Sequence, residues 1–205
     1  MGVTAQKRMS KGQRRHQLLD VAATLLAEGD TQNVTMERVA EHAGVSKALP
    51  YAHFENAEDL LVTLYRRSSV ELGEAIWRAL ESADEDDDLA SVWADAYYHC
   101  SITQGVVFAA LIRPGSPVPA KADGRGHAEE FVSKILHRHF GVDPGHARAT
   151  AAVLQGAFHG GSHTWLRDPR ARSIVVATAA DVVRGVVESA PRCERHAHPT
   201  SNEAR

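Results

Sequence analysis

The chain has 205 residues, 43% of them hydrophobic, and a formal net charge of −3. This length allows one large domain or two small ones with a buried core, and two cysteines, Cys100 and Cys193, are too few for a disulfide framework. Because no long apolar run or secretory leader is visible, we expect a cytoplasmic protein without a membrane span, and the net charge alone argues against a nucleic-acid partner.

That average conceals a strong segregation of charge along the chain. Residues 1–16 hold five bases and no acid, whereas residues 68–99 hold nine acids and one base, Arg78. A basic arm ahead of a folded domain indicates a polyanionic partner, although a solvated, disordered start explains the same charges. We interpret the acidic run 84–88 as a solvated loop between helices.

Four helices are expected in the first third of the chain. Apolar residues recur at helical spacing from Arg14 until the break at 29–30. Thr35 and Ser46 can cap two short helices, the second reaching about Phe54, and Asn56 can cap a long one.

The sequence pattern predicts helices in the rest of the chain as well. We expect helices over 89–104 and 106–112, a loop over 114–126, a helix over 127–140, helices over 146–167 and 170–189, and a disordered tail over 191–205. The sequence therefore predicts an all-α protein.

The two short helices join through Ala43-Gly44-Val45, which is typical of a helix-turn-helix. Gly44 permits the sharp turn, and Ala43 is small enough for the point where the helices cross. In that motif the second helix enters the major groove of DNA while the first crosses the backbone. An ordinary corner between two helices is the alternative for this triplet taken alone.

The residues around the turn resemble the N-terminal domain of the TetR family of transcriptional regulators over about residues 14–65. The matching residues are Leu18-Leu19-Asp20-Val21-Ala22, Leu26-Ala27-Glu28, Thr35, Val39-Ala40-Glu41-His42-Ala43-Gly44-Val45-Ser46-Lys47, Tyr51-Ala52-His53-Phe54 and Leu60-Leu61.

The resemblance implies a three-helix helix-turn-helix DNA-binding domain, followed by a helical domain that binds a small ligand and dimerises. We therefore expect a basic arm over 1–12, a DNA-binding domain over 13–55, a ligand and dimer domain over 56–190, and a tail over 191–205. The expected function is that of a transcriptional regulator, and most members of the family are repressors. We expect it to bind a palindromic operator as a homodimer and to be released from the DNA by a small hydrophobic effector. No cofactor is expected.

DNA contacts follow from the resemblance and the charge pattern. Thr35 matches a phosphate-binding helix start, and Tyr51 and His53 match the family's Tyr-x-His phosphate contacts. The expected DNA-binding residues are Thr35, Ser46, Lys47, Ala48, Leu49, Tyr51, His53, Lys11, Arg14 and Arg15, with Lys7 and Arg8 completing the basic arm.

Three positions depart from the family pattern: Ala48-Leu49, Pro50 and Ala57. Pro50 lacks an N–H and biases Leu49 away from the α-helical region, so we expect an irregular or kinked start of the DNA-reading helix. Where the family usually has a lysine, Ala57 removes one phosphate contact.

In the second half, Ala152, Gly156 and Gly160 form a row of small residues four apart, which lets a neighbouring helix approach closely. We expect the last two helices to form a two-fold interface, with tolerated glycines as the alternative. Its expected residues are Ala152, Gly156, Gly160, Val175, Ala179, Val182 and Val186.

The expected effector site is an apolar pocket with a few polar groups, although plain core is the commoner role of each such residue. Its expected lining is Trp93, Tyr97, Cys100, Phe108, Leu111, Phe131, Phe158, His159 and His163.

Two other classes of protein remain as alternatives. His159 and His163 have the i, i+4 spacing of metal ligands, with a third ligand from His99, His127 or Cys100, but no general base lies between them. A helical interaction protein that has lost or altered DNA binding would explain Pro50 and Ala57. No nucleophile elbow, phosphate loop or dinucleotide fingerprint is present, so we do not expect an enzyme.

Overall fold

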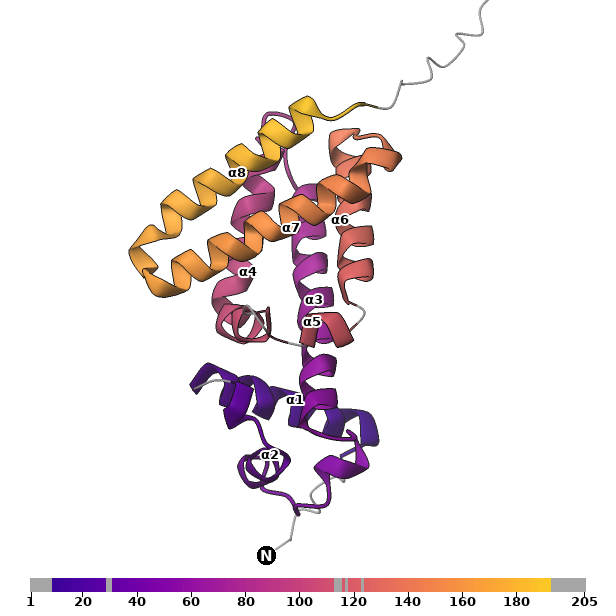
Figure 1. Cartoon of the computed structure of the whole chain (residues 1–205), viewed down its shortest axis with the longest axis vertical. Helices are drawn as coiled ribbons and strands as arrows, with labels where there is room; N and C mark the ends of the chain where they lie inside the picture. Colours follow the sequence, from indigo (N-terminus) through magenta and orange to yellow (C-terminus); the bar gives the residue numbers. More distant parts are fainter. Residues whose placement is uncertain (1–8, 29–30, 113–115, 117, 123, 193–205) are drawn as a thin grey trace, which may run out of the picture.

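The computed structural model describes residues 9–28, 31–112, 116, 118–122 and 124–192, without the side chains of 101–109, 112, 119–120 and 124–127. A small group of helices at the N-terminal end joins a larger bundle through the long central helix α3 (Figure 1). The helices are α1 (Lys11–Glu28), α2 (Met36–His42), α3 (Ala57–Glu81), α4 (Leu89–Ile112), α5 (Val118–Lys121), α6 (Gly124–Phe140), α7 (Pro144–Arg167) and α8 (Arg172–Ser189). Three short 3-10 segments lie at Thr31–Asn33, Pro50–Ala52 and Pro169–Ala171.

The expected all-α class is confirmed: the described residues contain no strand, and one isolated β-bridge joins Val142 to Arg192. The loop expected over 114–126 is wrong in part, because α5 lies within it and α6 already begins at Gly124. Prolines and glycines suggested a loop, but packing against α3 and α4 stabilises the short helix.

Local chemistry sets the helix ends near the N-terminus. The Thr35 hydroxyl accepts from the backbone N–H of Arg38 at 3.2 Å, and the Asn56 side chain accepts from that of Asp59 at 2.9 Å. Each cap satisfies a donor that the first turn of its helix leaves open. Gly44 has φ +65°, which places it in the left-handed region and ends α2 sharply.

The segment expected as the third short helix is not an α-helix. Backbone N–H groups of Leu49, Ala52 and His53 each donate to the carbonyl three residues earlier, and Pro50–Ala52 forms a 3-10 turn. The irregular start is thus confirmed, since Pro50 has no N–H to offer the Ser46 carbonyl. The expected bias on Leu49 is wrong, because its φ of −66° and ψ of −43° are α-helical.

Two clusters of buried side chains follow each other along the molecule. The first joins α1, α2 and the start of α3 to Leu111, Val118 and Ala122 from α4 and α5. The second fills the bundle of α3, α4, α6, α7 and α8 around Trp93 and Tyr98. Because α3 and α4 run through both clusters, the two ends of the molecule share rigid elements.

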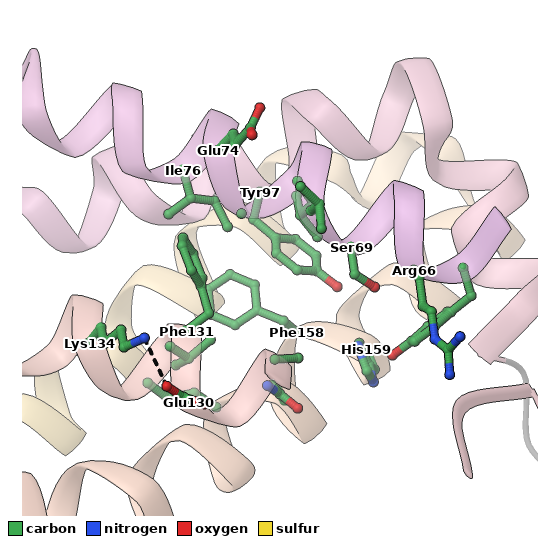
Figure 2. Close-up of a pocket in the computed structure, with 18 of the residues that line it drawn as sticks. Arg66, Ser69, Glu74, Ile76, Tyr97, Glu130, Phe131, Lys134, Phe158 and His159 are labelled. Carbon is green, nitrogen blue, oxygen red and sulfur yellow. Dashed lines mark ion pairs between the residues drawn. The ribbon is translucent and has the colours of Figure 1, made fainter. Parts of the chain in front are cut away.

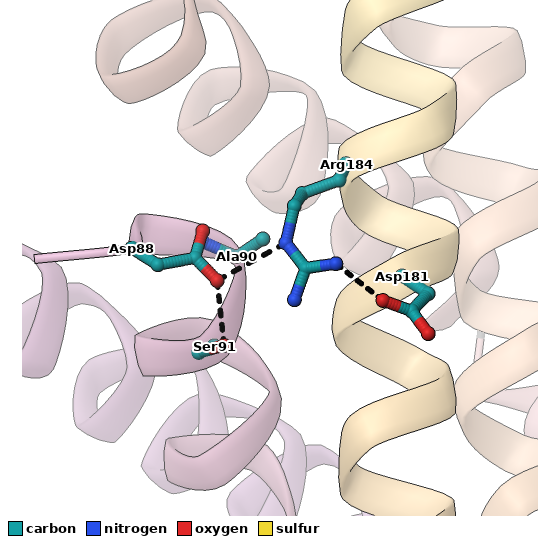
Figure 3. A network of polar contacts seen from close by, with 5 residues as sticks. All are labelled: Asp88, Ala90, Ser91, Asp181 and Arg184. Atoms are coloured by element: carbon teal, nitrogen blue, oxygen red, sulfur yellow. Dashed lines mark hydrogen bonds and ion pairs between the residues drawn. The ribbon is translucent and has the colours of Figure 1, made fainter.

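The acidic loop between α3 and α4 is tied to α8 at its last residue. Arg184 donates from Nε to Asp88 at 3.1 Å and also bonds Asp181 one turn earlier in α8 (Figure 3). The Ser91 hydroxyl donates to Asp88 at 2.6 Å, and this bond, more than the one from Arg184, holds the pKa of the Asp88 carboxyl below its ordinary value. The rest of the run, 84–87, is exposed as expected.

Candidate functional site

The helix-turn-helix presents an exposed edge formed by Ser46, Lys47 and Ala48, with Leu49 half-buried behind them. These are the residues expected to read base edges. The side chains of Thr35 and Tyr51 also take part in structure: Thr35 caps α2, and the Tyr51 hydroxyl donates to Glu37 at 3.3 Å. Tyr51 therefore braces the 3-10 turn against α2 while about half of it remains exposed.

Arg15 has a different place from the one expected. Its guanidinium lies 4.2 Å from the centre of the Phe54 ring, donates to the His53 carbonyl oxygen and donates to the Thr63 hydroxyl at 3.2 Å. Arg15 thus joins α1, the end of the segment expected to read DNA and α3 as a clamp, and its expected contact with a phosphate stays a prediction.

A cluster of positive charge surrounds His53. Burial first, and then the charges of Lys11, Arg15 and Arg14, lower the pKa of the His53 imidazole from 6.5. Its Nδ1 is buried and has no hydrogen-bond partner. Three cations and an imidazole gathered at one point form a surface suited to a DNA phosphate. Lys7 and Arg8 lie outside the described residues.

A cavity of about 760 Å³ lies in the second half, between α3, α4, α6 and α7 (Figure 2). Its walls are mainly apolar. The Phe158 ring lies at the centre of the aromatic wall, stacked with Trp93 at 5.9 Å between centroids and 4.5 Å from Tyr97. On α3, Gly73 leaves room for the Phe131 ring, since a Cβ there would lie 3.1 Å from it.

Polar groups occur at both ends and in the middle of this cavity. Arg66 lies at one end, and the ion pair of Lys134 with Glu130, 2.8 Å apart, lies at the other (Figure 2). Inside, Ser69 Oγ, Tyr97 Oη and Gln155 Nε2 are buried without hydrogen-bond partners. Such atoms are rare in folded proteins and each calls for an explanation.

Five of the nine expected pocket residues line this cavity: Trp93, Tyr97, Phe131, Phe158 and His159. Cys100 and His163 are partly buried outside its lining. Leu111 is corrected to a core position, fully buried beneath α1 and α3, because α4 extends beyond the cavity. The side chain of Phe108 lies outside the described residues.

Sequence reasoning missed the α3 wall of the cavity, which includes Arg66, Ser69 and Gly73. The sequence did contain an indication of this wall, because Ser68-Ser69 and Gly73 interrupt the otherwise apolar face of the helix α3. Gln155 on α7 carried no such signal. As for the metal alternative, no group of three potential ligands occurs among the residues that the structure describes.

The row of small residues on α7 is exposed. Ala152, Gly156 and Gly160 face solvent, and a Cβ on either glycine would meet no described atom within 4 Å. On α8 the expected interface residues point inward: Val175 and Ala179 are buried, and Val182 and Val186 pack on the same core. The outward face of α8 consists of other residues, including Ile174, Ala177, Thr178 and Gly185.

Comparison with known proteins finds similar sequences, chiefly at the helix-turn-helix. Residues 18–64 match the family of bacterial regulatory proteins described as the tetR family. The HTH-type transcriptional activator FasR of Mycolicibacterium smegmatis is 23% identical over 168 residues, covering 80% of this chain and 77% of that protein. The fatty acid metabolism regulator protein of Bacillus subtilis is 30% identical over 69 residues, which are 34% of each chain.

Among solved structures, the fatty acid degradation regulator FadR from Bacillus halodurans superposes with a TM-score of 0.65 at 15% identity. The match covers 87% of this chain and 97% of that one. In both, an N-terminal helix-turn-helix, the arrangement that places a helix in the major groove of DNA, precedes a larger helical bundle. Residues 18–64 of this chain are thus similar to the tetR family of bacterial regulatory proteins, and its fold as a whole is similar to that of FadR. None of its described helices is long and apolar enough to cross a membrane.

Proposed function

We propose that this regulator binds a palindromic operator as a homodimer and is controlled by a small effector with a long apolar chain, such as a fatty acid derivative. The observation that carries the effector is the cavity of about 760 Å³ with aromatic and aliphatic walls. Such a volume is within the range of ordinary ligand sites. The two relatives whose names refer to fatty acid metabolism and degradation support an acyl chain.

Residues that line the cavity and also pack against the helix-turn-helix support a coupling between effector binding and DNA binding. Tyr65 and Ala122 line the cavity and also belong to the buried cluster that packs α1 and α2. An effector that displaces either side chain would alter the packing of the helix-turn-helix. Coupling requires that the effector bind one arrangement of these helices better than the other.

The dimer is supported by the exposed small residues of α7 and by the exposed outward face of α8 beside them, which carries Ile174. Glycine inside a helix costs about 1 kcal/mol relative to alanine. Among the described residues nothing packs closely on Gly156 or Gly160, so a second copy is the natural reason for keeping both. One helix-turn-helix also reads few base pairs, whereas a two-fold dimer reads two half-sites about 34 Å apart.

Selection of bound fragments from random double-stranded DNA tests the operator. We expect enrichment of a palindrome, and enrichment of no sequence would favour the interaction protein that has lost DNA binding. Added acyl compounds should then release the selected DNA, as followed by fluorescence anisotropy. Because FasR is described as an activator, transcription from the operator in a reconstituted system decides between repression and activation.

A further inference from the structure

Three buried polar atoms inside the cavity have no hydrogen-bond partner: Ser69 Oγ on α3, Tyr97 Oη on α4 and Gln155 Nε2 on α7. Figure 2 shows the Tyr97 hydroxyl pointing along the cavity toward Ser69. The Tyr97 side chain is only 6% exposed. The nearby Ser162 hydroxyl donates to the Phe158 carbonyl at 3.0 Å, and by geometry no hydrogen bond joins it to the Tyr97 hydroxyl.

The chemistry of this set is that of hydrogen-bond donors. Burial raises the pKa of the Tyr97 hydroxyl well above its ordinary value, against a smaller opposing effect of Ser162, so Tyr97 keeps its proton. The amide nitrogen of Gln155 donates only, and a serine hydroxyl can donate or accept. An acceptor oxygen of a ligand is therefore the one kind of group to which all three atoms can donate.

Four side chains of the lining carry a charge, and one of them, Arg66, lies one turn before Ser69 on α3. Arg66, Glu74, Glu130 and Lys134 are all exposed. The Nε of Arg66 donates to the Ala122 carbonyl oxygen at 3.0 Å, and Lys134 pairs with Glu130. An ionised carboxylate among Ser69, Tyr97 and Gln155 would thus be buried without a cation, which is costly.

We infer that Ser69, Tyr97 and Gln155 form a subsite for an uncharged acceptor oxygen of the effector, such as the carbonyl of an ester, thioester or amide. The apolar chain then lies along the wall of Phe131, Trp93 and Phe158. This inference rests on the effector role proposed above and adds a specificity to it: the protein responds to an esterified or otherwise neutral acyl group and discriminates against the free, ionised acid.

Calorimetric binding of two probes of matched chain length to the full chain tests the subsite. The probes are methyl dodecanoate and sodium dodecanoate, at about pH 8, where a carboxyl group is ionised. We expect the ester to bind at least about ten-fold more tightly, because the buried donors satisfy its carbonyl without a charge to neutralise. Release of the selected operator should follow the same order.

Single variants locate the effect. Ser69→Ala, Tyr97→Phe and Gln155→Leu should each weaken ester binding about three- to ten-fold, the effect of one lost hydrogen bond. Ser68→Ala and Tyr98→Phe are matched controls: both side chains are buried next to the subsite in sequence, but neither lines the cavity. The Tyr98 hydroxyl instead donates to the Phe158 carbonyl at 3.1 Å. The controls should leave ester affinity within about two-fold.

Two outcomes would overturn the subsite alone: unchanged ester affinity in all three variants, or tighter binding of dodecanoate that Arg66→Ala abolishes. The second result would place the polar end of the effector at the mouth of the cavity. Binding of neither probe to the wild-type chain would overturn both the subsite and the proposed acyl effector.

Discussion

At the scale of single residues, Arg15 shows how a basic side chain expected at DNA is used for folding. It contacts Phe54, the His53 carbonyl and Thr63 at once, and these belong to segments that must keep a fixed angle to each other. Its neighbour Arg14 bonds Gln17 on the same helix instead. Two adjacent arginines therefore have separate roles.

Replacing Arg15 with methionine should destabilise the protein by about 2 kcal/mol, through loss of a cation–π contact and two charge-assisted hydrogen bonds. Urea unfolding measures the change. Arg14→Met is the matched control and should alter stability by less than about 0.5 kcal/mol while weakening operator binding and flattening its salt dependence. Equal, small stability losses in both variants would show that Arg15 is no clamp.

His53 should make stability depend on pH. Burial and the nearby cations lower its folded pKa below the ordinary value of 6.5, so below that pH the unfolded chain binds more protons than the folded chain. The contribution is fully present above about pH 7 and is lost as the pH falls through 6.5 toward the lowered folded value. His53→Gln should reduce this loss, as measured by urea midpoints across the range. A variant with an unchanged pH profile would contradict the assignment.

At the scale of elements, the segment expected to read DNA is a series of 3-10 turns instead of a regular helix. Pro50 is buried at its centre, with the exposed residues Lys47 and Ala48 before it and the Tyr51–Glu37 hydrogen bond after it. The irregularity thus lies inside a well-packed segment, and it sets how Lys47 and Ala48 are presented.

Pro50→Leu restores an N–H that can reach the Ser46 carbonyl, but it also gives the unfolded chain more freedom. These effects oppose each other, so we expect the free energy of unfolding to change by less than about 1 kcal/mol, and operator affinity to be kept. Circular dichroism and anisotropy check both. If specific binding is lost while the fold survives, the 3-10 geometry itself is required for reading bases.

At the scale of the whole molecule, the fold separates the three regions for which partners are proposed. The helix-turn-helix lies at one end (Figure 1). The cavity lies between α3, α4, α6 and α7, and the small residues Ala152, Gly156 and Gly160 of α7 are exposed. Since α3 runs from the first to the second, one continuous helix connects the proposed effector site with the proposed operator contacts.

Gly156→Leu should convert the proposed dimer into monomers, because a leucine side chain would hold the partner helix away from α7. Light scattering gives the mass, and operator affinity should fall with it. Gly156→Ala is the control: it also removes the glycine cost, about 1 kcal/mol, but keeps the close approach. A Gly156→Leu variant that remains dimeric with full affinity would exclude this face as the interface.

The sequence by itself determined most of the helices and the helix-turn-helix. Helical periodicity, the caps at Thr35 and Asn56 and the turn at Gly44 are local, and local hydrogen bonds and sterics decide them. The disruption by Pro50 was predictable for the same reason: a missing N–H is a property of one residue.

Only the tertiary structure decided which faces meet. Leu111 and Trp93 lie on the same helix, yet one packs beneath α1 and the other against the cavity, because α4 crosses both ends of the molecule. Likewise, Val175 and Ile174 are neighbours in sequence, but Val175 is buried and Ile174 is 69% exposed. Periodicity shows that a helix has an apolar side, whereas the partner of that side depends on contacts between residues far apart in the chain.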